Sequence, residues 1–124
     1  MIKIVIGGDC IPAARPRFSG GRAYQPKRNV EYRAVVQAAA FAAMKGNKPL
    51  QGEVSATVRL YRKYKPTSRI FGDVDNHLKS IFDGLNQIVF DDDSQVIRCS
   101  VEKYQDKLQP RAEIDVESVE ELGE

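Results

Sequence analysis

The sequence is poor in the side chains that bind zinc or act as catalytic nucleophiles. It has two cysteines, Cys10 and Cys99, without CxxC spacing, and a single histidine, His77. A zinc site of the Cys/His type needs several such ligands close together, so the composition speaks against this class of site. One histidine without a convincing serine or cysteine partner also speaks against a nucleophilic triad. We expect both cysteines to be reduced thiols of a cytosolic protein.

Long apolar runs are absent as well. No run of about 18 apolar residues occurs, which excludes a membrane-spanning helix. Residues 1–8 hold one lysine and a short apolar run before Asp9, a pattern typical of a first strand and not of a signal peptide. The sequence has no internal repeat and no low-complexity segment. We expect a single domain over residues 1–124 and a cytoplasmic location.

The net charge of +2 hides a strong asymmetry between the two halves of the chain. Residues 1–71 carry 14 Lys and Arg against 3 Asp and Glu, whereas residues 72–124 carry 5 against 14. The basic half indicates a polyanionic partner. The acidic half indicates either a metal site or a solvated tail.

Hydrophobic periodicity predicts an α+β fold. Ile2, Ile4 and Ile6 alternate with more polar neighbours, as in a strand. The expected elements are a strand over 2–6, a long loop over 9–27, a helix over 29–45, a strand over 54–60, a basic loop over 62–72, a helix over 76–87, and strands over 97–101 and 112–116. This β-α-β-α-β-β order predicts a mixed sheet with helices covering one face.

Four local expectations concern the second half of the chain. Asp75 is a candidate N-cap, because its carboxylate can accept hydrogen bonds from the free N–H groups of a first helical turn. His77 is expected on the surface of that helix. The loop over 105–110 predicts that the last two strands form a hairpin. Residues 117–124 are expected to be a frayed acidic tail.

Carboxylates gather in the stretch over residues 72–96. Asp73 and Asp75 lie two positions apart, and in an extended segment such side chains face the same way, so both can face one cavity. Lys79 lies one helical turn beyond Asp75 and can project beside it. The acidic run over 91–93 begins just past the other end of the helix. Crowded carboxylates repel one another unless a cation compensates.

Hard oxygen ligands with few histidines favour Mg²⁺ or Mn²⁺ over zinc. Such an ion can polarise a phosphate and activate water. A calcium loop of the EF-hand type fails, because neither Asp73 nor Asp91 is followed by glycine at the sixth position. Two simpler interpretations stay open: a solvated turn for the run over 91–93, and a turn or cap for the Asp73 and Asp75 pair.

A longer pattern in the same stretch of sequence is more specific than the short aspartate pair or the acidic run. The pattern D-x-D-N-x-x-K-x-x-x-D-x-L-N, followed after a short gap by D-D-x-Q-V, resembles the RusA family of Holliday junction resolvases. The residues that carry it are Asp73, Asp75, Asn76, Lys79, Asp83, Leu85, Asn86, Asp92, Asp93, Gln95 and Val96. Pro12, the segment Arg15-Pro16-Arg17-Phe18 and the segment Ala23-Tyr24-Gln25-Pro26-Lys27 resemble the family's basic loop and its Tyr-x-Pro-Lys segment. The resemblance covers residues 3–117.

The resemblance implies a homodimeric, Mg²⁺-dependent endodeoxyribonuclease, with Mn²⁺ as a substitute, that resolves four-way DNA junctions by paired nicks in recombination and repair. It implies that Asp73, Asp75 and Asp93 are catalytic carboxylates that bind the metal, with Asp92 as a further candidate ligand. It implies that Lys79 is catalytic, and we expect its ammonium group to stabilise the charge on the transition-state phosphate. A phage or prophage origin in a bacterial host follows from the same resemblance.

Basic residues without a local counter-charge are expected to contact the DNA backbone; the alternative is that they serve solubility alone. The expected DNA-binding positions are Arg15, Arg17, Arg22, Lys27, Arg28, Arg62, Lys63, Lys65 and Arg69. Tyr24, Tyr61 and Tyr64 could stack on bases, or pack in the core and at edges. Residues 38–43 hold more small apolar positions than one buried face needs, with Phe41 off the main stripe, which predicts a dimer face.

Two rival functions stay open from sequence. One is a phage nuclease that cuts flaps, forks and other branched DNA, and the other is a catalytically silent dimer that only binds branched DNA. The set of Asp73, Asp75, Lys79 and Asp93 argues against the silent dimer, because DNA binding alone does not favour carboxylates facing a polyanion. A two-fold enzyme would place two identical sites across a pseudo-symmetric junction.

Overall fold

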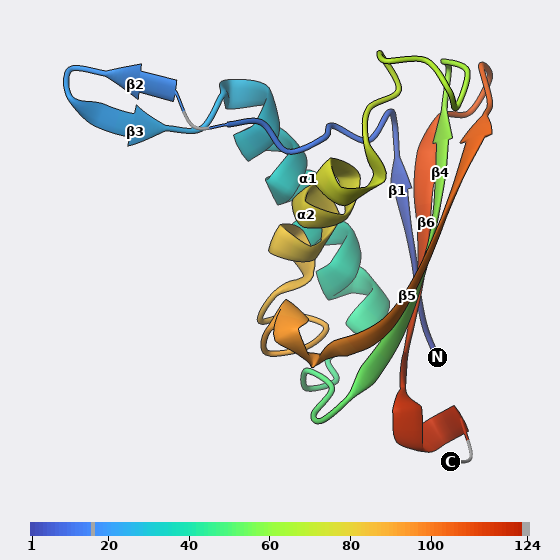
Figure 1. Cartoon of the computed structure of the whole chain (residues 1–124). Coiled ribbons are helices and arrows are strands. Elements are labelled where there is room, and N and C mark those ends of the chain that lie inside the picture. Colours follow the sequence, from blue (N-terminus) through green and yellow to red (C-terminus); the bar gives the residue numbers. More distant parts are fainter. Residues whose placement is uncertain (16, 123–124) are drawn as a thin grey trace.

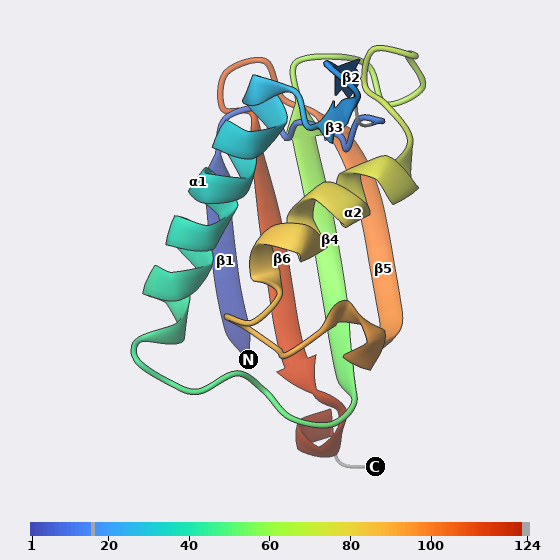
Figure 2. The same cartoon turned by 90° about the vertical axis from the view of Figure 1, so that its left-hand side faces the viewer.

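The computed structural model describes residues 1–15 and 17–122, with side chains described as far as residue 120. The elements are β1 (Ile2–Gly7), β2 (Arg17–Ser19), β3 (Arg22–Tyr24), α1 (Lys27–Met44), β4 (Val54–Arg62), α2 (Val74–Leu85), the 3-10 helix η1 (Asp93–Gln95), β5 (Val96–Gln105), β6 (Arg111–Ser118) and the 3-10 helix η2 (Val119–Leu122). The predicted α+β class and mixed sheet are confirmed. Both α-helices cover one face of the sheet and leave the other open (Figures 1 and 2).

The main sheet has the strand order β1-β6-β4-β5. β6 runs antiparallel to β1 and to β4, whereas β4 and β5 are parallel. A parallel pair needs a long crossover connection, and α2 supplies it. The predicted hairpin of the last two strands is therefore wrong, because β4 lies between β5 and β6. Long-range pairing of β6 with β1 and β4 decides the neighbours, and the short loop before β6 does not.

Alternation along β1, β4 and β6 separates an apolar face from a polar face. In β4, Val58 and Leu60 are fully buried on the helix side, and Ile114 of β6 lies beside Val58. On the open side, Arg59 of β4 donates to Glu113 and Asp115 of β6. The helices therefore cover the face that the sequence makes apolar, and the open face carries the ion pairs of Arg59.

The two helices approach each other closely at Gly84 of α2. A Cβ atom at this position would lie 2.5 Å from Cγ1 of Val36 in α1, so no larger residue fits without movement. This contact between α1 and α2 fixes α2 across the sheet, and thereby fixes the position of its first turn.

Neither described helix is long and apolar enough to cross a membrane.

Several predicted boundaries need correction. α1 begins at Lys27, and α2 begins at Val74, so Asp73 and not Asp75 occupies the N-cap position. The predicted frayed tail is wrong over residues 117–122. β6 continues to Ser118, and Val119 is buried and donates its N–H to the Glu53 carbonyl at 3.0 Å. Residues 123–124 lie outside the described part.

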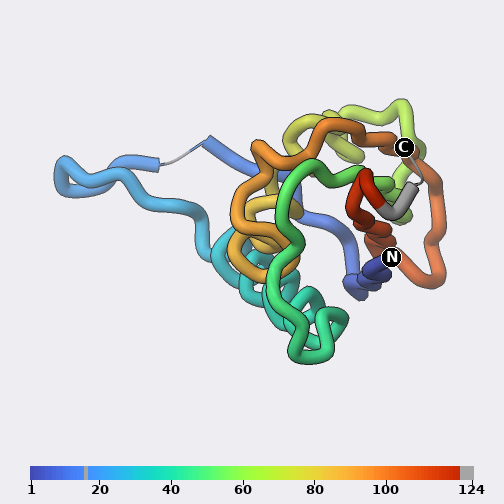
Figure 3. Tube along the Cα trace, turned by 90° about the horizontal axis from the view of Figure 1, so that it is seen from below, coloured from blue at the N-terminus to red at the C-terminus, as the bar shows by residue number. Residues whose placement is uncertain are grey.

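The segment predicted to be an irregular loop contains a β-hairpin. β2 and β3 pair antiparallel around Gly20 and Gly21, which both have positive φ, as a tight two-residue turn requires. The hairpin projects away from the sheet and the helices as an arm (Figures 1 and 3). The order is therefore β-β-β-α-β-α-β-β, not the predicted β-α-β-α-β-β.

Candidate functional site

Two free carboxylates lie at the beginning of α2. Asp73 has an extended backbone at the N-cap position, and Asp75 lies in the first helical turn. An aspartate at an N-cap normally accepts a hydrogen bond from the first turn, but the Asp73 side chain accepts none. Within the described residues neither carboxylate takes part in a hydrogen bond or an ion pair, and both residues are exposed. Both are therefore free to bind a cation.

The backbone just before Asp73 is held by two donors that converge on one carbonyl. Arg62 Nη1 lies 2.5 Å and His77 Nε2 lies 2.6 Å from the Phe71 oxygen. Gly72 then turns the chain with a φ of +93°, and a Cβ there would lie 3.1 Å from His77 Nε2. Because Arg62 and His77 hold the backbone before it, this left-handed turn at Gly72 fixes the direction in which the chain enters α2 at Asp73.

His77 is buried, so its prediction as a surface residue is wrong. Its Nε2 donates to a carbonyl, so its Nδ1 accepts from the Cys10 thiol, with 3.1 Å between Nδ1 and Sγ. Burial lowers the pKa of His77 and raises the pKa of Cys10 to about 11. The pair is neutral near pH 7 and joins α2 to the segment that follows β1. No local pattern reveals this contact, because the partners are 67 positions apart.

Arg62 departs from the expectation that it contacts DNA. Its side chain is only 7% exposed, and Nε lies 3.5 Å from Oδ1 of Asp9. It also donates to the Ile70 carbonyl at 3.2 Å. The guanidinium braces the loop that leads into α2 and does not face solvent. The sequence holds a signal for this, since Arg62 is in phase with Val58 and Leu60 on the buried side of β4.

The acidic turn after α2 is held by Gln95. Its Oε1 accepts from the N–H groups of Asp91 at 2.8 Å and Asp92 at 3.0 Å, while its Nε2 donates to the Leu50 carbonyl at 2.9 Å. The Asp92 carboxylate caps η1 by accepting from Ser94 N at 2.9 Å. Hydrogen bonding by Ser94, through its hydroxyl group first and its backbone N–H second, lowers the pKa of Asp92. The Asp93 carboxylate has no hydrogen-bond partner within the described residues. The cap occupies Asp92 and leaves Asp93 free.

One chain does not bring Asp93 to the Asp73 and Asp75 pair. The ring of Phe71, just before the pair, lies under Lys103 near the end of β5, whereas η1 immediately precedes β5 (Figure 2). Most of a strand therefore separates the two, roughly 20 Å. In residues 1–15 and 17–122, no three Asp, Glu, His or Cys side chains are grouped closely enough to hold a metal ion. A carboxylate pair alone does fit Mg²⁺, which commonly takes one or two carboxylates and completes its shell with water and substrate phosphate.

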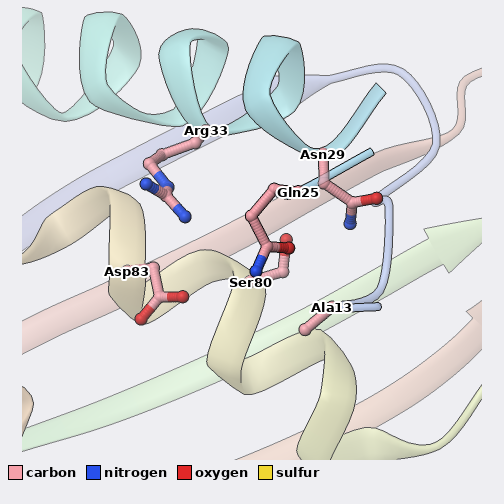
Figure 4. A pocket seen from close by; sticks show the side chains of 6 residues that line it. All are labelled: Ala13, Gln25, Asn29, Arg33, Ser80 and Asp83. Atoms are coloured by element: carbon pink, nitrogen blue, oxygen red, sulfur yellow. The ribbon is translucent and has the colours of Figure 1, made fainter. Parts of the chain in front are cut away.

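Lys79 lies one helical turn after Asp75 in α2 and borders a cleft of about 290 Å³, which is lined by Ala13, Ala14, Arg15, Asn76 and Lys79. The loop wall of this cleft is fixed to α2, because Ala13 N donates to the Asn76 carbonyl at 2.9 Å. Lys79 is exposed and forms no ion pair with another described residue. Asp83, four positions on, does not pair with it. Asp83 faces the same small hollow as Arg33 of α1 (Figure 4).

The other basic residues predicted to bind DNA are exposed, and the elements that carry them gather at the end of the molecule where α2 begins (Figure 1). They are Arg15, Arg17, Arg22, Lys27, Arg28, Lys63, Lys65 and Arg69. Among the three tyrosines considered for base stacking, Tyr61 stacks on Tyr104 with centroids 4.9 Å apart, and Tyr24 is 46% exposed. Tyr64 is half-buried beside Arg62.

Free carboxylates next to a lysine, at the cationic end of a molecule, are typical of a metal-dependent nuclease. The family model of endodeoxyribonuclease RusA matches residues 8–117, nearly the whole chain. The chain belongs to the RusA endodeoxyribonuclease family, whose members are metal-dependent nucleases that resolve Holliday junctions. It is also 27% identical over 141 aligned positions to "Uncharacterized protein YqaN" of Bacillus subtilis (strain 168), covering 95% of this chain and 96% of that protein.

Proposed function

We propose that this chain is one protomer of a homodimeric, Mg²⁺-dependent enzyme that resolves Holliday junctions by paired nicks in DNA recombination and repair. The observation that carries the proposal is the pair of unpartnered carboxylates, Asp73 and Asp75, beside Lys79 at an otherwise cationic end of the molecule. Carboxylates at such a place oppose the approach of DNA unless a cation lies between them and the phosphate. The pair therefore serves chemistry and not binding alone.

Asp73 and Asp75 would hold the ion. When bound, Mg²⁺ supplies polarisation of the scissile phosphate and a water of lowered pKa. Lys79 stabilises the additional negative charge on the phosphate in the transition state, because its ammonium group is unpaired and lines the same cleft as Arg15. Arg15 holds the phosphate backbone at the mouth of that cleft.

Asp93 is the third proposed catalytic carboxylate. Because it lies roughly 20 Å from the Asp73 and Asp75 pair within one chain, we infer that it acts at the pair of a second protomer. Gln95 keeps the turn around Asp93 fixed by tying it to the loop before β4. In this arrangement the dimer is needed for catalysis as well as for the pairing of two cuts.

The outer face of α1 is the proposed dimer contact. Val30, Val35 and Phe41 are 52%, 48% and 73% exposed on a helix that is apolar on its buried face as well. Phe41 also borders an apolar hollow of about 400 Å³ together with Met44 and Ile88. Exposed apolar side chains beside an apolar hollow favour association with another protein surface. In a two-fold dimer, the same face of α1 in a second copy of the chain supplies that surface.

A panel of DNA substrates tests the proposed function. A synthetic four-way junction, a flap and a linear duplex are incubated with the protein in Mg²⁺ and, separately, in EDTA. We expect the protein to nick the four-way junction but not the flap or the linear duplex, and to do so in Mg²⁺ but not in EDTA. Cutting of the flap as well supports the rival branched-DNA nuclease, and tight junction binding without cutting supports the silent dimer.

A further inference from the structure

The arm formed by β2 and β3 has two chemically different faces. Its register pairs Arg17 with Tyr24, Phe18 with Ala23, and Ser19 with Arg22. Paired residues of an antiparallel ribbon lie on one face, and neighbours along a strand alternate between faces. Phe18 and Ala23 therefore share one face of the arm, while the arginines and Tyr24 share the other.

Phe18 has no cover within the described structure. It is 77% exposed. Its cross-strand partner, Ala23, is exposed as well and is too small to shield an aromatic ring. The arm projects away from the sheet and both helices (Figures 1 and 3). The tight turn at Gly20 and Gly21 gives the arm a defined ribbon geometry. The ring is thus presented to a partner outside the chain.

The surrounding charge selects the class of partner. No acidic residue lies between Asp9 and Glu31, whereas this segment contains Arg15, Arg17, Arg22, Lys27 and Arg28. A second copy of the arm would bring like charges together. A nucleic acid offers both complements at once, phosphates for the cationic face and flat bases for an aromatic ring.

We propose that Phe18 stacks on a nucleobase at the branch point of the DNA while Arg17 and Arg22, on the opposite face of the arm, contact phosphates. The inference rests on the proposed action on branched DNA and adds the residue that recognises the branch. In a continuous duplex every base is stacked between neighbours, so an inserted ring must first unstack a step. At a branch point the stack is already interrupted, so Phe18 favours branched DNA over linear duplex.

A tryptophan probe tests the contact directly, because the chain has no tryptophan of its own. The variant Phe18→Trp keeps an aromatic ring, and the added substitution Asp75→Asn prevents cleavage during the titration. Binding is followed by the anisotropy of a dye on a distal DNA arm, and stacking by tryptophan emission excited at a wavelength that spares tyrosine. The matched control is Leu108→Trp in the same background, at a position 93% exposed in the loop before β6.

We expect emission of the Phe18→Trp protein to be quenched as the four-way junction binds, more strongly than with a linear duplex, and emission of the Leu108→Trp protein to stay constant. Phe18→Ala is expected to weaken junction binding about tenfold, the loss of one base–aromatic stack, whereas Leu108→Ala leaves binding unchanged.

Junction binding without a change in Phe18→Trp emission overturns the inference and leaves the proposed function standing. A wild-type protein that fails to bind the junction at all contradicts the proposed function itself. Emission that changes on diluting the protein without DNA shows that the ring packs against a second copy, and that result also overturns the inference.

Discussion

At the scale of single residues, the carbonyl of Phe71 links the fold to the candidate site. Arg62 and His77 both donate to it, and both residues are buried. The Asp73 and Asp75 pair could be predicted from the sequence because its spacing and its place near a helix start are local. The contacts that hold His77 and Arg62 in place could not, since their partners Cys10 and Asp9 come from a distant segment of the chain. A buried polar residue looks like a surface residue until its partners are known.

The substitution His77→Leu tests this support. It removes one donor from the Phe71 carbonyl and the acceptor of the Cys10 thiol, so we expect a loss of about 1–3 kcal/mol in the free energy of unfolding. We also expect cleavage to need a higher Mg²⁺ concentration, because the carboxylate pair is less well positioned. Urea unfolding and the Mg²⁺ dependence of the nicking rate measure the two effects.

The control is His77→Gln, whose amide nitrogen can still donate to the carbonyl. It should restore much of the Mg²⁺ response even where stability is not fully recovered. An unchanged Mg²⁺ response in His77→Leu protein that is fully folded would show that the histidine supports the fold alone.

The two thiols are expected to react very differently. Cys10 is buried and its pKa is raised to about 11, so almost no thiolate is present near pH 8, whereas Cys99 is exposed. A thiol reagent such as DTNB should label about one thiol per native chain and both in denaturant. Cys99→Ser should abolish the fast reaction. Rapid labelling of both thiols in the native protein would contradict the buried Cys10–His77 contact.

At the scale of elements, the sequence predicts what is local and misses what is paired over distance. Both helices and the four sheet strands follow from periodicity. The neighbours of β6 do not, because residues far apart in the chain decide the pairing. The β2–β3 arm carried a usable signal, the Gly20-Gly21 dipeptide between short alternating segments, which is typical of a hairpin. The N-cap prediction missed by two positions, since aspartates at 73 and 75 both suit a helix start.

The separation of the α2 start from the acidic turn predicts a complementation effect. Asp73→Asn and Asp93→Asn are each expected to lose nicking at least 100-fold while junction binding is kept. When the two variants are mixed and allowed to exchange subunits, a heterodimer has one site with both carboxylates intact. Nicking of one strand per junction should therefore return in the mixture.

The matched control is Asp91→Asn, which removes the same charge from the same turn at an exposed carboxylate without partners. It should nick at the wild-type rate. No recovery in the mixed sample, with subunit exchange verified, would mean that the proposed site does not combine residues of two protomers.

The outer face of α1 gives a prediction about assembly. Phe41→Lys places a charge in the proposed apolar contact and should weaken dimerisation about 10- to 100-fold or more, as substitutions at central contact residues do. Light scattering after size exclusion should show a dimer for the wild type at micromolar concentration and a monomer for Phe41→Lys. Leu108→Lys, at an exposed apolar position elsewhere, should remain a dimer. A monomeric wild type would contradict the homodimer.

At the scale of the whole molecule, the two halves of the charge asymmetry have different outcomes. Most of the exposed cations of the first half lie on or next to the arm, the start of α1 and the loop before α2, at one end of the molecule (Figure 1). Part of the acidic excess is paired on the open face of the sheet, where Arg111 contacts Glu113 at 2.7 Å and Asp106 at 2.9 Å. Among the described residues the carboxylates of Asp73 and Asp75 are unpaired, and they directly follow the cationic loop before α2. The small net charge therefore conceals a polar molecule with a defined cationic end.

The most direct measurement maps the nicks in a four-way junction whose strands are labelled one at a time. The account predicts Mg²⁺-dependent cuts at matching positions in two opposed strands, absent in EDTA and reduced at least 100-fold by Asp75→Asn although the junction is still bound. Cuts in one strand only, cuts at unrelated positions, or full activity in the Asp75→Asn protein would contradict a symmetric resolvase that uses this carboxylate.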